Sequence, residues 1–285
     1  MYIRVFFVTA ILFYLQVIAY KPVVIIHGVM TGNSTMVNLT NDIVKSHPGT
    51  KVYVTNRFGS WSSLLPMWHQ VEKIGKDVLE IASNHPEGIH IIGYSQGGLI
   101  ARGIIEAYPD LNVKKFISLS SPQGGQYGTK FLHLLFPSLS VKTAYELFYS
   151  VMGQEISVAN YWRDPHQPLL YLDYSCYLPY INNEIESEGS SLYKTNLEKL
   201  EKLVMFGGPD DGVITPWQSS RFAYYDDNEN VVELYDQPLY QFNSLGLRTL
   251  NETGRLKVVE LAGVSHFDWH LNKTVIFDHL IPELD

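Results

Sequence analysis

The sequence predicts an α/β fold in which helices cover both faces of a mostly parallel central sheet. Residues 23–26 (VVII) form a continuous apolar run, as expected for a strand that is buried on both faces. Short β-branched runs then alternate with longer amphipathic segments, which is typical of a parallel sheet. A glycine-containing segment at 93–98 joins a predicted strand directly to a predicted helix.

The first half of the chain follows this alternation closely. Four strands are predicted, at residues 23–26, 51–54, 89–92 and 115–119. Two helices are predicted between them, at residues 68–83 and 97–108. His85-Pro86 and Pro109 end these two helices, because proline cannot continue the helical hydrogen bonding.

The alternation fails between residues 122 and 200. This segment contains a Gly-rich bend at 123–125, an apolar helical stretch at 130–152 and an aromatic, irregular segment at 161–180. Long insertions in compact domains are often functional lids, so we expect one single domain, residues 20–285, with a lid insertion at about 122–200. The alternation resumes with predicted strands at 203–206, 231–234 and 257–261, and a helix near 275–280.

Residues 1–19 resemble a secretory signal peptide. Arg4 precedes an apolar run at 5–18, and Ala19 provides a small residue at the expected cleavage site. The alternative is a signal anchor, but a spanning helix needs about 20 apolar residues. No later run is long enough to span, so we expect no transmembrane segment in the mature chain. Four Asn-x-Ser/Thr triplets fit a secretory route as glycosylation candidates, at Asn33, Asn38, Asn251 and Asn272.

The composition excludes several classes of protein. The single cysteine, Cys176, excludes zinc fingers, iron–sulfur proteins and disulfide scaffolds, which need several cysteines. The net charge of −8 and the absence of a basic run argue against a nucleic-acid partner. His266 and His270 have the spacing of a metal pair on a helix, but no third ligand is evident. We therefore expect no metal and no organic cofactor.

The strongest motif is Gly93-Tyr94-Ser95-Gln96-Gly97, written G-x-S-x-G. A serine nucleophile is held at the tip of a sharp turn between a strand and a helix, and only small residues fit two positions before and after it. The strand before this motif and the helix after it meet that requirement, so we predict that Ser95 is a nucleophile. The alternative is an ordinary glycine-rich turn that binds an anion at a helix N-terminus.

A serine nucleophile needs a histidine base and a carboxylate that orients it, and both occur later in the chain. Asp210 and Asp211 follow the predicted strand at 203–206, and His266 follows the strand at 257–261. Parallel strands gather such loops at the carboxyl end of the sheet. Spacing alone does not decide between the two aspartates. His27, which precedes the serine in the sequence, is expected to shape the loop after the first strand.

The motifs also resemble a known family. The runs Ile26-His27-Gly28, Gly93 to Gly98, Ser120 to Gly125, Gly207 to Ser220 and Ala262 to His266 are similar to those of palmitoyl-protein thioesterases, specifically the type 2 branch. The resemblance implies an α/β-hydrolase fold and a triad of Ser95, Asp211 and His266. It places the backbone N–H donors of the oxyanion hole on Val29 and Gln96. It also implies a fatty acyl thioester substrate, either an S-acylated protein or peptide or acyl-CoA, and a lysosomal location, with secretion as the alternative.

Two other functions use the same features. A lipase or carboxylester hydrolase has the same triad and differs only in its substrate. A non-catalytic secreted lipid-binding protein with the same fold would usually have lost a residue of the triad, and all three are present here. The insertion is rich in apolar residues between 131 and 152, which suits an acyl chain and equally suits packing on the core.

Overall fold

A six-stranded parallel sheet organises residues 20–284, the part of the chain that the computed structural model describes. The predicted signal peptide at 1–19 lies outside the described residues. The strands lie in the order β2-β1-β3-β4-β5-β8, and every neighbouring pair is parallel. Their bounds are β1 Val23–Ile26, β2 Val52–Val54, β3 Ile89–Tyr94, β4 Val113–Leu119, β5 Lys202–Gly207 and β8 Leu256–Glu260. The predicted mostly parallel sheet is confirmed.

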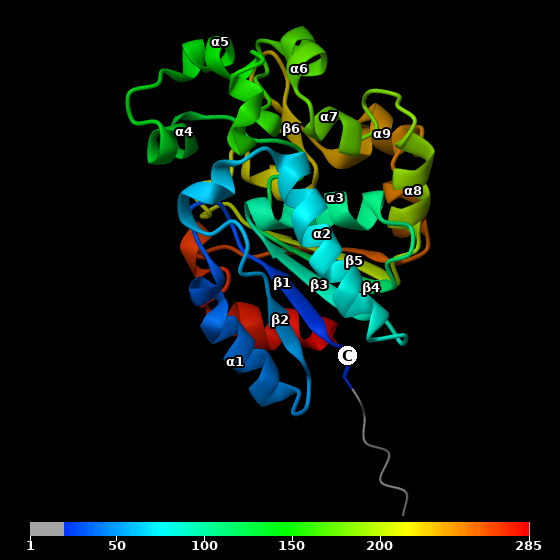
Figure 1. Cartoon of the computed structure of the whole chain (residues 1–285). Coiled ribbons are helices and arrows are strands. Elements are labelled where there is room, and N and C mark those ends of the chain that lie inside the picture. The colour runs from blue at the N-terminus through cyan, green and yellow to red at the C-terminus, as the bar shows by residue number, and fades with distance from the viewer. Residues whose placement is uncertain (1–19, 285) are drawn as a thin grey trace, which may run out of the picture.

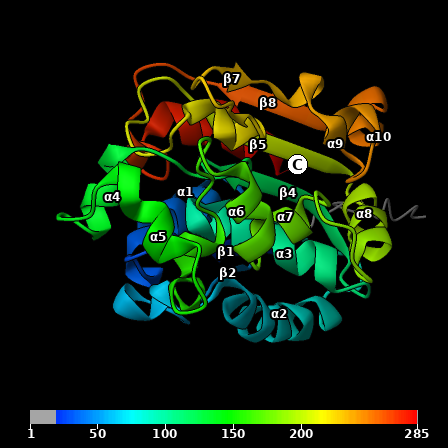
Figure 2. The same cartoon turned by 90° about the horizontal axis from the view of Figure 1, so that it is seen from above.

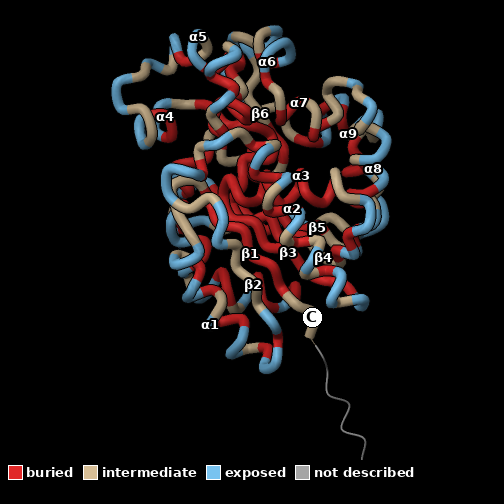
Figure 3. Tube along the Cα trace, in the orientation of Figure 1, coloured by how far each residue is buried: buried red, intermediate tan, exposed pale blue. Residues whose placement is uncertain are grey.

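Helices cover both faces of this sheet (Figure 1). One face packs against α2 (Met67–Ser83) and α3 (Gln96–Ala107), and the other against α1 (Val37–Ser46) and the C-terminal segment. Alternate residues of β1 point to opposite cores, so Val24 and Ile26 join the first and Val23 and Ile25 the second. β1 is therefore buried on both sides, as its continuous apolar run predicts (Figure 3). The edge strands β2 and β8 are more exposed.

The segment between β4 and β5 lies over the carboxyl end of the sheet (Figures 1 and 2). It carries five short helices: α4 (Thr129–Leu135), α5 (Ala144–Phe148), α6 (Pro168–Tyr174), α7 (Leu178–Ile181) and α8 (Ser190–Glu198). Two more, α9 (Pro238–Gln241) and α10 (Leu247–Glu252), precede β8. The apolar side chains of this segment are largely buried in the same core as α2 and α3. The predicted insertion thus corresponds to a packed helical cap above the strand ends.

Two sequence predictions need correction. The apolar stretch at 130–152 is not one helix, because Pro137 lies between α4 and α5 and interrupts the helical hydrogen bonding. Of residues 231–234, only Val231–Val232 (β7) form a strand, and it pairs antiparallel with β6 (Tyr224–Tyr225) outside the main sheet. The predicted final helix is confirmed, and it is a π-helix, Val275–Leu280. Within residues 20–284, no helix combines the length and the apolarity needed to cross a bilayer.

Candidate active site

Ser95 lies on a sharp turn between β3 and α3. Its backbone is in a strained left-handed conformation, with φ of 54° and ψ of −128°. The glycines beside it leave no room for side chains. A Cβ atom on Gly97 would lie 2.2 Å from the carbonyl oxygen of Ile26, and one on Gly93 would lie 2.4 Å from the Cα of Gly98. The predicted strand–turn–helix context of the G-x-S-x-G motif is therefore present.

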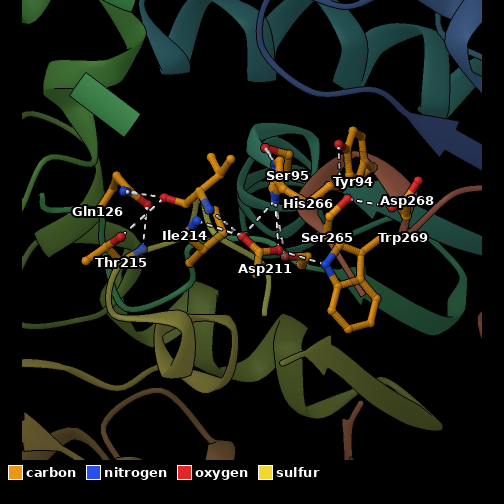
Figure 4. A network of polar contacts seen from close by, with 12 residues as sticks. Tyr94, Ser95, Gln126, Asp211, Ile214, Thr215, Ser265, His266, Asp268 and Trp269 are labelled. Atoms are coloured by element: carbon orange, nitrogen blue, oxygen red, sulfur yellow. Dashed lines mark hydrogen bonds and ion pairs between the residues drawn. The ribbon is translucent and has the colours of Figure 1, made fainter. Parts of the chain in front are cut away.

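Three side chains form a hydrogen-bonded chain at the carboxyl end of the sheet (Figure 4). The Oγ atom of Ser95 lies 3.0 Å from Nε2 of His266, and Nδ1 of His266 lies 2.9 Å from Oδ2 of Asp211. An ionised carboxylate only accepts hydrogen bonds, so Nδ1 donates to Asp211 and Nε2 is free to accept from the serine hydroxyl. All three residues are less than a tenth exposed. The arrangement can activate a hydroxyl nucleophile.

The two neighbouring aspartates make different contacts. Asp210 is exposed, and its Oδ2 accepts the backbone N–H of Gly263 at 2.7 Å. Asp211 is buried and contacts the imidazole. The backbone N–H of His266 also donates to the carbonyl of Asp211 at 2.8 Å, which holds the two loops together.

The electrostatics of Asp211 favour its ionised form. Burial alone would raise the pKa of this carboxyl group. Hydrogen bonds from His266, from the hydroxyl of Ser120 and from the N–H of Ile214 outweigh the burial and lower the pKa of Asp211 below its ordinary value. A charged carboxylate beside Nδ1 fixes the tautomer of the imidazole and stabilises its cation.

Three residues outside the predicted triad hold Asp211 and His266 in place. Ser120, directly after β4, donates to Asp211 at 2.6 Å, and Trp269 Nε1 donates to the same oxygen at 2.7 Å. The hydroxyl of Tyr94 donates to the carbonyl of His266 at 2.9 Å. Ser120 follows a central strand at its carboxyl end and lies in a family-like run, and Tyr94 lies in the serine motif, but neither signal predicts a contact with Asp211 or His266.

The two predicted oxyanion donors lie beside Ser95. Gln96 is the first residue of α3, so its N–H has no partner within the helix. Its side chain is buried and bound to Ser63, Ser157 and Tyr161, which anchors this end of the helix. Val29 follows β1 and lines the same cavity as Ser95. His27 lies in the same loop, with Nδ1 3.0 Å from the carbonyl oxygen of Gly28 and Nε2 3.1 Å from that of Arg57.

A mostly apolar cavity of about 280 Å³ opens onto Ser95 and His266. The helical cap, the short helix Ser60–Leu64 and the loops after β1, β5 and β8 all contribute to its walls. Its apolar lining residues are Val29, Met30, Trp61, Leu64, Phe131, Leu134, Leu135, Phe136, Val213 and Phe267. The cavity can hold an apolar group next to the serine hydroxyl. A larger cavity of about 580 Å³, between α6 and α9, shares no lining residue with it.

Other predicted residues lie away from the serine. The sequon residues Asn33 and Asn38 are exposed, whereas Asn251 and Asn272 are partly buried. The Nδ2 atom of Asn251 donates to the hydroxyl of Tyr240 at 2.7 Å. Cys176 is a free thiol, and burial raises its pKa, which disfavours the reactive thiolate.

His270 does not form a metal site with His266. Its ring lies 4.6 Å from that of Tyr94, and burial followed by the charge on His266 lowers the pKa of His270 to about 4. Among residues 20–284, no three His, Cys, Asp or Glu side chains are placed to share a metal ion.

The parallel sheet and the strained serine turn, with Asp211 and His266 on the loops after β5 and β8, define an α/β-hydrolase. The mature form of the lipase BlEst2 from Bacillus licheniformis has a similar structure, with a TM-score of 0.50 at 15% identity over 93% of this chain and 92% of that chain. A lipase–esterase related protein from Clostridium acetobutylicum also has a TM-score of 0.50, at 13% identity over 93% and 94% of the two chains. At these identities the likeness concerns the fold alone.

Sequence comparisons identify the family. A family model described as palmitoyl protein thioesterase matches residues 22–266. The lysosomal thioesterase PPT2 homolog of Drosophila melanogaster is 51% identical over 268 residues, which are 94% of this chain and 93% of the relative. Lysosomal thioesterase PPT2 of Homo sapiens is 45% identical over 258 residues, with coverages of 90% and 85%. The chain belongs to the palmitoyl protein thioesterase family, and it is a thioester hydrolase.

Proposed function

We propose that the chain hydrolyses long-chain fatty acyl thioesters in two steps through an acyl-enzyme on Ser95. The observation that carries this proposal is the hydrogen-bonded chain from Ser95 through His266 to Asp211, at the floor of an apolar cavity. A hydroxyl group is a weak nucleophile near neutral pH, so it needs the adjacent base. No Asp, Glu, Lys or Arg side chain lines the cavity, which suits a hydrocarbon chain.

In the first step, Nε2 of His266 takes the proton of the Ser95 hydroxyl as Oγ attacks the thioester carbonyl. The N–H groups of Val29 and Gln96 stabilise the negative charge that develops on the carbonyl oxygen. Asp211 keeps the imidazole oriented and stabilises its cation. The carbon–sulfur bond then breaks, and the thiol leaves with the proton from His266. In the second step, His266 activates a water molecule that releases the fatty acid and restores Ser95.

The helical cap acts as a lid in this proposal. Phe131, Leu134 and Phe136 come from the segment between β4 and β5, and they line the cavity at Ser95. Phe131 is almost fully buried, whereas Leu134 is 56% exposed at the rim. An acyl chain that lies against these side chains removes apolar surface from water, which favours binding by about 0.8 kcal/mol for each buried methylene.

The proposal extends to location and processing. Relatives of this chain are named lysosomal thioesterases, and residues 1–19 have the composition of a cleaved signal peptide. A lysosomal enzyme with glycans on the exposed Asn33 and Asn38 is consistent with both observations. Replacement of each asparagine by glutamine, followed by glycosidase treatment, tests these two sites. A smaller glycosidase-dependent mobility shift than that of the wild type is expected in each single variant, and an unchanged shift in both would contradict the assignment.

One experiment separates the proposal from the lipase and binding-protein alternatives. Palmitoyl-CoA, an S-palmitoyl peptide and a matched palmitoyl oxygen ester are offered to the wild type and to Ser95→Ala. We expect wild-type hydrolysis of at least one thioester, no turnover by the variant, and slower cleavage of the oxygen ester. Much faster cleavage of the oxygen ester would instead identify a lipase or carboxylester hydrolase. Wild-type protein that binds the acyl chain without turnover would identify a binding protein.

A further inference from the structure

The carboxylate of Asp211 accepts four hydrogen bonds besides that of His266. The N–H groups of Val213 and Ile214 donate to Oδ1, at 3.1 and 2.8 Å. Ser120 Oγ and Trp269 Nε1 donate to Oδ2, at 2.6 and 2.7 Å. Within residues 20–284, no lysine or arginine forms an ion pair with this carboxylate. Its charge is therefore stabilised by neutral donors.

The four donors differ in origin. Val213 and Ile214 are close to Asp211 in the sequence, so their hydrogen bonds belong to the turn itself. Ser120 and Trp269 come from the loops after β4 and β8, and both are buried. Both donate to Oδ2, the oxygen nearest to Nδ1 of His266. Figure 4 shows the indole of Trp269 directed at this carboxylate. Ser120 also has a left-handed backbone, with φ of 44°, so the fold holds it in a strained conformation at this point.

We propose that Trp269 and Ser120 are positioning residues whose hydrogen bonds to Oδ2 of Asp211 keep the Asp211–His266 pair active in acidic solution. The proposal rests on the function proposed above for Ser95, Asp211 and His266. Hydrogen bonds to a charged group are stronger than those between neutral groups, and an N–H and an O–H that converge on one oxygen also fix the plane of the carboxylate.

The direction of the pH effect follows from the charge of the pair. With neutral imidazole the pair carries one negative charge, and with imidazolium it carries none. Donors that point at Asp211 stabilise the more negative state, so they lower the pH at which the Asp211–His266 pair gains a proton. Loss of either donor is expected to move the acid limb of the activity profile to higher pH. The enzyme would then lose activity in acid first.

Other titratable groups near the pair do not replace these donors. From β3, Tyr94 stacks on His266 at 5.3 Å, and burial followed by the charge of Asp211 raises its pKa, so it stays neutral. His270 is also neutral above a pH of about 4. Asp210, on the loop after β5, and Asp268, on the loop after β8, are acidic. These groups add no positive charge that could stabilise Asp211.

The test measures kcat/KM against pH for Trp269→Phe and Ser120→Ala with a thioester substrate. Each variant is expected to show an acid limb shifted upward by about half to one pH unit, because a change in one hydrogen bond to a charged group shifts a coupled titration on that order. The rate of Ser95 labelling by a fluorophosphonate, measured over the same pH range, should shift in parallel. This second readout does not depend on the choice of acyl substrate.

Trp162 provides a matched control for the tryptophan. It is fully buried, its Nε1 has no hydrogen-bond partner among the described residues, and it does not line the cavity at Ser95. Trp162→Phe therefore removes the same atoms without removing a hydrogen bond, and its acid limb should match the wild type. An equal shift in Trp162→Phe would trace the effect to general loosening and overturn the proposal.

The possible outcomes separate this proposal from the proposed function. In Trp269→Phe and Ser120→Ala, activity could instead fall by the same factor at every pH, with the acid limb unchanged. That result would show that both residues are only structural, and it would overturn the proposal. If Trp269→Phe does not fold, the profile of Ser120→Ala decides in the same way. Wild-type protein without thioester hydrolysis, or an active Ser95→Ala, would instead contradict the proposed function itself.

Discussion

The Nδ1 atom of His266 lies 2.9 Å from Oδ2 of Asp211. Asp210, the neighbouring acidic residue in the same turn, does not contact the imidazole. Asp210 instead accepts a backbone N–H from the loop that carries the histidine. Both aspartates thus fasten the loop after β5 to the loop after β8, but only one of them contacts the imidazole. Their different contacts lead to a direct comparison by substitution.

Asp211→Asn should lower kcat by roughly 10³–10⁴-fold, because an amide beside Nδ1 favours the wrong tautomer of the histidine, as the equivalent change does in serine proteases. Asp210→Asn is the matched control and should change kcat less than about tenfold, since its exposed side chain only accepts a backbone hydrogen bond. Steady-state hydrolysis of a thioester by both variants provides the measurement. An equal loss in the two variants would contradict the assignment of Asp211.

Much of this site could be predicted from the sequence because its signals are local. Gly93 and Gly97 flank Ser95 at fixed spacing, and the buried runs before and after them define the strand and the helix. Ser120 and Trp269 gave no such signal. They lie 91 and 58 residues from Asp211, so only the folded sheet brings them to its carboxylate. The choice between Asp210 and Asp211 was open for the same reason.

The helical cap was also beyond prediction in detail. Its position in the chain was evident, because the strand–helix alternation stops there. The bounds of its short helices were not evident from the sequence. The apolar residues between 130 and 152 fit one helical pattern, although Pro137 interrupts the helix there. Burial against the core, rather than intrinsic periodicity, determines where α4 and α5 begin and end.

Gly97→Ala should destabilise the fold, because the new Cβ would lie 2.2 Å from the carbonyl oxygen of Ile26. Overpacking of this kind costs about 1–3 kcal/mol, which corresponds to a decrease in Tm of about 2–12 °C in a chain of this size. Gly32→Ala is the control, since the nearest atom to its added Cβ lies at 3.9 Å. Thermal unfolding should separate the two variants, and a wild-type Tm for Gly97→Ala would contradict the packing described at this turn.

Leu134→Ala should weaken the hydrolysis of long acyl chains selectively. Leu134 lines the cavity from α4, so its loss removes apolar contact worth about 1 kcal/mol, or about a fivefold decrease in kcat/KM for a palmitoyl thioester. An acetyl thioester does not reach this wall and should be cleaved at the wild-type rate. Val151→Ala is the control, because Val151 is in the same cap but is 82% exposed and does not line the cavity. Equal effects on both chain lengths would argue against an acyl-binding wall.

Glu106 should make the folded chain more stable in acid than at neutral pH. Burial raises the pKa of Glu106 to about 8, and Arg102 only partly opposes this shift. Between about pH 4.5 and 8 the unfolded chain loses this proton and the folded chain keeps it. The contribution of Glu106 to the free energy of unfolding therefore decreases as pH rises, by up to about 1.4 kcal/mol for each pH unit.

The variant Glu106→Gln isolates this contribution, because glutamine stays neutral and nearly keeps the volume of the protonated side chain. Urea unfolding at several pH values gives the free energy of unfolding of the wild type minus that of the variant, and this difference should decrease from pH 5 to pH 8. The exposed Glu87, changed to Gln, controls for the loss of a surface carboxyl. A difference that increases with pH would mean that Glu106 is ionised beside Arg102. The buried pair would then stabilise the fold as an ion pair in neutral solution, and the chain would lose that stabilisation in acid.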